Sequence, residues 1–189
     1  MEEYKTKRIH YVEVAKDIYA AITPADGLDI TDAGMMDNFS NSAYINRGEG
    51  LVSDTFFDLP HARDLREFCV KKSGHAPKYV INTHGHWDHF WGNQVFEEAT
   101  IMGHKDMMKD CSGDKNKVPV FKFLHNSKGV QKLMAGAMTA MFKKNLPAGK
   151  KAKFIVSVGE KDFDLTGVVP KTPDVLFESN TVLDLDGTE

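Results

Sequence analysis

Residues 83–89 read Thr-His-Gly-His-Trp-Asp-His and directly follow the apolar run Tyr79-Val80-Ile81. The apolar run predicts a short buried strand, so the seven residues lie where a strand ends and a loop begins. Imidazole and carboxylate groups are ligands that zinc accepts, and packing rarely requires four of them so close together. Catalytic groups of α/β proteins commonly lie at this end of a strand. The stretch therefore predicts the metal-binding half of a hydrolytic site.

The spacing within this stretch indicates how the four ligands are divided between two metal ions. Residues two apart on an extended loop point the same way, so His84 and His86 are expected to hold one ion. Asp88 and His89 follow where the chain turns, and are better placed for a second ion nearby. Two ions about 3.5–4 Å apart hold and activate a hydroxide for hydrolysis. If only one ion binds, Asp88 is the expected general base toward water.

Two more histidines are weaker candidates for completing the ligand set. His104 follows a strand and lies near the same rim, where a hydrogen-bonding role is the favoured interpretation. His125 belongs to a helical segment further along the chain and is the weaker candidate of the two.

The segments around the motif alternate between strand and helix patterns. Residues 9–22 predict two short strands, and residues 42–54 predict a hairpin around a glycine-rich turn. A helix from about 60 to 72, a strand at 78–82, a short helix at 93–98 and a strand at 99–102 follow. Such alternation predicts an α/β fold with helices layered against a sheet.

Residues 118–146 carry an apolar, methionine-rich stripe at helical period, and Asn126-Ser127 are predicted caps. This helix is interpreted either as a lid over the substrate or, preferably, as one packed on its own core or on a second copy of the chain. Further on, 175–177 is an apolar piece, and 181–185 predicts a strand.

Composition narrows the class of protein. The 189 residues suffice for a single domain spanning 1–189, or for part of a larger one, and a hydrophobic fraction of 41% is ordinary for a soluble protein. A net charge of −3 gives no reason to expect nucleic acid or an anionic membrane as partner. Two cysteines are too few for a disulfide framework, and no signal peptide is recognisable, so a cytoplasmic location is expected.

Residues 83–89 match the Thr-His-x-His-x-Asp-His signature of the metallo-β-lactamase superfamily, which the chain resembles. Residues 40–55 resemble the paired strands of that family, which end in Asp-Thr, and Gly92-Asn93 and 101–104 resemble the segment after its motif. The resemblance implies an α/β (α+β) fold, the αββα sandwich, with the site at the sheet edges. It assigns His84 and His86 to a first metal, and Asp88 and His89 to a second. It also suggests that Asp54 orients a ligand, although an ordinary strand-end residue is an equal alternative.

The family also has a further His, a bridging Asp and a last His on later strands, and residues 170–189 resemble the strands just before them. The resemblance therefore implies an N-terminal half: a piece of a longer enzyme, a truncated product with little activity alone, or a chain completed by a partner or a homo-oligomer. The large apolar face of the first sheet would then be exposed.

The leading hypothesis is a metal-dependent hydrolase with one or two zinc ions, iron and manganese being alternatives. Its metal-bound hydroxide would attack a small-molecule ester, thioester, lactone, amide or phosphodiester. A second hypothesis keeps the fold as a di-iron redox enzyme of the persulfide dioxygenase or flavodiiron type. A third is a non-catalytic fragment that associates with a partner.

Overall fold

A single sheet organises the residues that the computed structural model describes, namely 3–23, 40–111, 113–127, 129 and 165–186. Its eight strands lie side by side in the order of the chain. They are β1 (Glu3–Lys5), β2 (His10–Ala15), β3 (Ile18–Ile22), β4 (Ser42–Ile45), β5 (Leu51–Ser53), β6 (Tyr79–Asn82), β7 (Thr100–His104) and β8 (Val175–Phe177). The predicted strands at 9–22, 42–54, 78–82 and 99–102 are confirmed, whereas β1 had no prediction.

The strand pairing of the sheet changes from antiparallel to parallel at β5. Strands β1 to β5 pair antiparallel with their neighbours, and β5 to β8 pair parallel. The parallel register aligns Val52, Val80 and Ile101 in one row. Parallel neighbours need a crossover connection, and helices lie between β5 and β6 and between β6 and β7. The carboxyl ends of β5, β6 and β7 consequently meet at one edge, and the mixed α/β class is confirmed.

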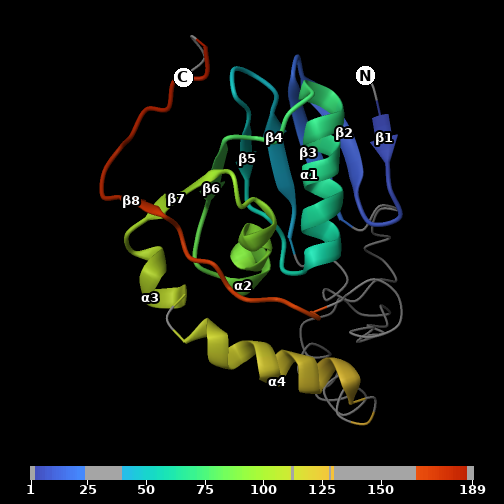
Figure 1. Cartoon of the computed structure of the whole chain (residues 1–189), viewed down its shortest axis with the longest axis vertical. Helices are drawn as coiled ribbons and strands as arrows, with labels where there is room; N and C mark the ends of the chain where they lie inside the picture. The colour runs from blue at the N-terminus through green and yellow to red at the C-terminus, as the bar shows by residue number, and fades with distance from the viewer. Residues whose placement is uncertain (1–2, 24–39, 112, 128, 130–164, 187–189) are drawn as a thin grey trace, which may run out of the picture.

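Helix α1 (Leu59–Ser73) is the crossover from β5 to β6 and matches the predicted helix. The Asp58 side chain accepts a hydrogen bond from the backbone N–H of His61, and Pro60 occupies the first turn, where its missing N–H is not needed. Gly74 ends the helix with a φ of 83°, a left-handed conformation that glycine adopts without strain. The apolar side of α1 lies on one face of the sheet (Figure 1).

The main core lies between α1 and that face. Phe68 of α1 stacks on Tyr11 at 3.8 Å between ring centroids, and Tyr19 and Tyr44 meet Phe68 edge-on. Complete burial of an aromatic side chain of this size stabilises a fold by about 1.5–3 kcal/mol. Alternate residues of β2 to β7 point into this core, which fixes the register of every strand.

The short helix that follows the motif begins earlier than predicted. Helix α2 (Trp87–Phe90) and the 3₁₀ helix η1 (Trp91–Val95) replace the helix expected at 93–98, whose position was wrong. The chain turns early because two backbone bonds hold it against β5: Thr55 N–H donates to His89 O, and Gly92 N–H donates to Phe56 O. A side chain at Gly92 would overlap the Thr55 carbonyl, so only glycine allows this approach.

The helical region after β7 also differs from the prediction. Helices α3 (Met107–Cys111) and α4 (Asp114–Asn126) come first, so Asn126 ends a helix instead of capping the start of one. Most of the methionine-rich stripe falls in 130–146, outside the described residues. Within the described helices, none is both long and apolar enough to cross a membrane.

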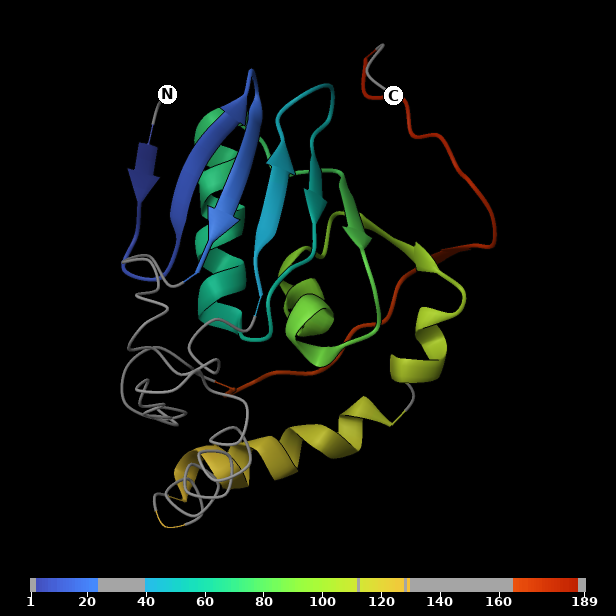
Figure 2. The same cartoon turned by 180° about the vertical axis from the view of Figure 1, so that it is seen from behind.

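Residues 165–186 return along the rim of the sheet. Leu165 and Val168 enter a second apolar cluster with Phe57 and Trp91, and the predicted piece 175–177 forms β8. The strand predicted at 181–185 is wrong: this segment leaves the sheet after β8, as Figure 2 shows, and finds no strand to pair with among the described residues.

The opposite face of the sheet carries no helix in the described part of the chain (Figures 1 and 2). The register aligns a half-buried row across this face, made of Val12, Ala20, Ala43, Ser53, Ile81 and Met102. The row is apolar except for Ser53, and its side chains are half-buried rather than fully exposed.

Candidate metal centre

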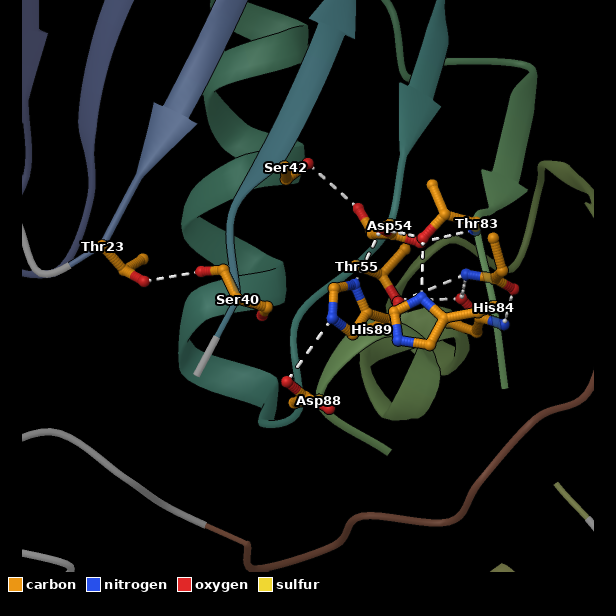
Figure 3. A network of polar contacts seen from close by, with 11 residues as sticks. Thr23, Ser40, Ser42, Asp54, Thr55, Thr83, His84, Asp88 and His89 are labelled. Atoms are coloured by element: carbon orange, nitrogen blue, oxygen red, sulfur yellow. Dashed lines mark hydrogen bonds and ion pairs between the residues drawn. The ribbon is translucent and has the colours of Figure 1, made fainter. Parts of the chain in front are cut away.

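The loop after β6 gathers the three imidazoles of the motif. His84 and His86 lie with ring centroids 4.5 Å apart, and His84 and His89 lie 4.0 Å apart. The strand ends at Asn82 and α2 begins at Trp87, so the loop is short enough to bring both ends of the motif together. Figure 3 shows His84 and His89 at the edge where β5 and β6 end.

Asp88 completes the cluster from the first turn of α2. Its Oδ2 lies 3.4 Å from His89 Nε2. Two ligand atoms on one tetrahedral zinc, each about 2.0–2.2 Å from the ion, are also separated by about 3.4 Å. The Asp88–His89 pair therefore has the spacing of two donors that share an ion.

Asp54 is the hub that holds this loop to the sheet. Its Oδ1 accepts the Thr83 N–H at 2.8 Å, and its Oδ2 accepts the Thr83 hydroxyl at 2.7 Å. The same Oδ2 lies 2.8 Å from His89 Nδ1, so the Nε2 atom of His89 is turned toward Asp88 (Figure 3). Of the two interpretations left open by the sequence, the geometry supports the one in which Asp54 orients a ligand.

The backbone of Asp54 is held in an uncommon conformation. Its φ is 61°, in the left-handed region that asparagine, aspartate and glycine visit most readily. Asp54 N–H donates to Ile81 O at 2.9 Å, and Asp54 O accepts the Ser42 hydroxyl at 3.0 Å. Three neighbouring strands thus fix a conformation that turns the carboxylate toward the loop. Such over-determined backbone is typical of functional sites.

The pKa values of the two central imidazoles move in opposite directions. Burial alone lowers the pKa of His89, but hydrogen bonds with Asp54 and Asp88 outweigh it and raise the pKa to about 9. Burial, with the nearby His89 and His86 rings, lowers the pKa of His84. At neutral pH, His84 is therefore neutral and presents a lone pair. His89 is protonated, and its two ring N–H groups face the carboxylates of Asp54 and Asp88.

A buried amide network supports the loop from below, and the sequence analysis did not identify it. Asn93 is fully buried and exchanges side-chain hydrogen bonds with Asn82 at 2.8 and 3.1 Å. Asn93 also accepts the Thr55 hydroxyl and donates to the backbone carbonyl of Lys171. This network fixes η1 against β5, β6 and the returning segment. The Gly92-Asn93 pair was the available signal, because a buried asparagine after a close-packed glycine requires partners.

Of the two weaker candidates, His104 makes its side-chain hydrogen bonds outside the cluster. His104 Nδ1 accepts the backbone N–H of Asp106, and His104 Nε2 lies 3.3 Å from Glu178 O, which agrees with a hydrogen-bonding role. His125 lies near the end of α4, and its side chain is outside the described ones.

The donor chemistry of the loop fits a divalent ion such as zinc, because imidazole and carboxylate are its usual ligands besides thiolate. Within the described residues, however, no three His, Cys, Asp or Glu side chains are arranged to hold one ion. The ring contacts and the Asp88–His89 spacing instead describe pairs of donors.

A comparison with known families agrees with the motif in the sequence. Residues 35–107 match the sequence model described as the metallo-beta-lactamase superfamily. This match supports the resemblance of the segment around residues 83–89 to that superfamily. The matched residues contain the whole loop 83–89 together with Asp54 and Asn93. They also contain α1 and the parallel strands β5, β6 and β7.

One curated protein is similar to this chain over a limited stretch. The hydroxyacylglutathione hydrolase of Pelagibacter ubique (strain HTCC1062) is 33% identical over 70 residues, which are 35% of this chain and 26% of that protein. The chain therefore spans about a quarter of the length of this relative.

Solved structures include two metallo-β-lactamases with a TM-score of 0.45 each. The protein from Erythrobacter litoralis, with β-mercaptoethanol in its active site, is 14% identical, and the alignment covers 57% of this chain and 46% of that one. The protein from Pseudomonas aeruginosa, in its mono-zinc form, is 15% identical over 56% of this chain and 46% of that one.

Proposed function

We propose that this chain carries the metal-binding half of a metal-dependent hydrolase. The observation that supports the proposal most is the gathering of His84, His86, Asp88 and His89 in one loop at the carboxyl end of β6. Packing alone does not require three imidazoles and a carboxylate at a sheet edge, whereas hydrolytic metal sites are built from these groups.

In this proposal His84 and His86 hold one ion, and Asp88 and His89 hold another. Zinc is the expected ion because it accepts both nitrogen and carboxylate ligands. When bound, such an ion lowers the pKa of water and stabilises the negative charge that develops on the attacked oxygen.

The side chains of the chain itself orient the ligands and handle protons. Asp54 holds His89 through Nδ1, which leaves Nε2, the atom that faces Asp88, as the one that would bind an ion. Where only one ion is bound, Asp88 Oδ2 is the group placed to accept a proton from water. The exposed fraction is small for two of these side chains, 18% for His89 and 16% for Asp88, so this pair is partly shielded from solvent.

The substrate class follows from this chemistry and from the relative. Esters, thioesters, lactones, amides and phosphodiesters all develop an oxyanion when hydroxide attacks them. The similar protein is by its name a hydrolase of hydroxyacylglutathione, which favours an acyl thioester for this chain.

Two measurements on the purified chain test the proposal together. Zinc content should be stoichiometric after incubation with zinc and removal of the excess, and a chromogenic thioester should be hydrolysed in a zinc-dependent manner. His86→Ala should lower both the zinc content and the rate of hydrolysis. His75→Ala is a matched control, because His75 is an exposed histidine whose ring contacts the backbone of its neighbour. A chain that is folded but binds no zinc would rule out the proposal for this chain.

A further inference from the structure

Thr83 lies between the strand that carries Asp54 and the loop that carries the histidines. Its backbone N–H and its hydroxyl both contact the Asp54 carboxylate, at 2.8 and 2.7 Å. Its hydroxyl oxygen also lies 3.0 Å from His84 Nδ1 (Figure 3). Thr83 is therefore in contact with Asp54 and with a predicted ligand at the same time.

The number of available protons determines the direction of these hydrogen bonds. A hydroxyl has one proton to donate, and at Thr83 that proton points to Asp54 Oδ2, because an ionised carboxylate can only accept. Toward His84 Nδ1 the same oxygen acts as acceptor, so Nδ1 carries the hydrogen. His84 then presents the lone pair of Nε2. The contact selects the tautomer of His84, just as the direct bond to Asp54 orients His89.

We propose that Thr83 is a positioning residue whose hydroxyl links Asp54 to His84, so that one carboxylate orients imidazoles at both ends of the loop. The inference rests on the proposed function, since it assigns Thr83 a role toward the same metal centre. It adds a coupling: His84 and His89, assigned to different ions, share the single oxygen Oδ2 of Asp54.

The structure provides a selective way to test the hydroxyl. Thr83 is exposed, so replacing its hydroxyl by a methyl group in Thr83→Val neither opens a cavity nor buries an unpaired group. The backbone bond from Thr83 N–H to Asp54 Oδ1 does not depend on the side chain and is retained. Thr83→Ser keeps the hydroxyl and serves as the rescue variant. Thr100→Val, a threonine of β7 in the same sheet, is the matched control.

The first readout is the tautomer of His84 in the metal-free chain, measured from imidazole nitrogen shifts by NMR at about pH 8. The wild type, Thr83→Ser and Thr100→Val should keep the hydrogen on Nδ1, and Thr83→Val should lose this preference. A wild-type His84 with its hydrogen on Nε2, or an unchanged tautomer in Thr83→Val, would overturn the inference.

The second readout is zinc affinity, measured by competition with a chelator. Loss of a partner that orients a metal ligand typically costs about 10–100-fold in affinity, so Thr83→Val should weaken zinc binding by this factor, with recovery in Thr83→Ser. Equal zinc affinity in the wild type and Thr83→Val would contradict the inference and leave the proposed function intact. If even the wild type binds no zinc, the proposed function fails for this chain, and the tautomer experiment alone decides the orientation of His84 by Thr83.

Discussion

Two histidine–carboxylate pairs in the described part of the chain have nearly the same geometry. His61 Nδ1 lies 2.7 Å from Asp58 Oδ1 at the start of α1, and His89 Nδ1 lies 2.8 Å from Asp54 Oδ2 in the candidate centre. The first pair is buried, with 6% and 0% of the two side chains exposed, and its imidazole lies between the rings of Phe56 and Phe57. The second pair lies at the sheet edge beside His84 and Asp88.

The difference shows that the bond between imidazole and carboxylate does not by itself define a role. Asp58 also accepts a backbone N–H of the first helical turn, so its pair caps a helix within the core. In the other pair, Nε2 of His89 faces a second carboxylate next to two more imidazoles. We infer that the first pair contributes stability and the second contributes ligands.

The largest expected effect comes from removing the imidazole of His89, compared with removing that of His61. His89→Ala should lower zinc affinity by more than about 100-fold, since it deletes a ligand and not merely a partner that orients one. His61→Ala should leave zinc affinity unchanged but lower the free energy of unfolding by about 2–4 kcal/mol, because it removes a buried ring and a partner of Asp58. Chelator competition and urea unfolding measure the two quantities. Equal zinc affinities in the two variants would contradict the distinction.

Exchanging each carboxylate for an amide gives the next effect. In the wild type, the Thr83 hydroxyl and His89 Nδ1 both donate to the Asp54 carboxylate. Asp54→Asn places an amide N–H donor against one of these two donors. Zinc affinity should fall by about 10–100-fold. Asp58→Asn is the matched control and should bind zinc as the wild type does. A wild-type affinity in Asp54→Asn would show that Asp54 does not orient the ligands.

The helix cap predicts a smaller effect, on stability alone. Asp58→Ala removes the side-chain acceptor of the His61 N–H, and loss of such a cap costs about 1–2 kcal/mol. Thermal or urea unfolding of the metal-free chain measures this cost. Zinc stoichiometry in the same variant should equal that of the wild type, and a loss of zinc would mean that the two pairs are coupled.

The smallest expected effect is a pH dependence of the folding stability that comes from the His89–Asp54 pair. The pKa of His89 is raised to about 9 in the folded chain, from about 6.5 in an unfolded one. Its contribution to stability is therefore complete below pH 6.5 and is lost as the pH rises through 9. The lowered pKa of His84 acts below pH 6.5 and does not disturb this window. Urea unfolding of the metal-free chain should show stability falling between pH 6.5 and 9, and the fall should largely disappear in Asp54→Asn.

Much of this arrangement could be predicted from the sequence. The apolar alternation at 78–82, the amphipathic pattern at 60–72 and the glycine-rich turn between β4 and β5 are local signals, and each produced the predicted element. The motif at 83–89 carries its chemistry in its own spacing, so the cluster of imidazoles was also predictable.

The remaining features depend on contacts between distant residues. The start of α2 at Trp87 follows from bonds between His89 O and Thr55, 34 positions apart, which periodicity does not reveal. Asp54 becomes a hub only because the register of β5 and β6 sets it beside Thr83. The strand expected at 181–185 had the right composition but no neighbouring strand to pair with in the described structure.

The most direct test of the central claim, that the loop 83–89 is a metal centre, is the number of zinc ions bound per folded chain. Equilibrium dialysis followed by elemental analysis should find at least one zinc per chain in the wild type. The same value is expected in the double control His10→Ala/His75→Ala, and a value near zero in His84→Ala/His89→Ala, with circular dichroism verifying that all three are folded. A folded wild type without zinc, or equal zinc in both double variants, would contradict the account.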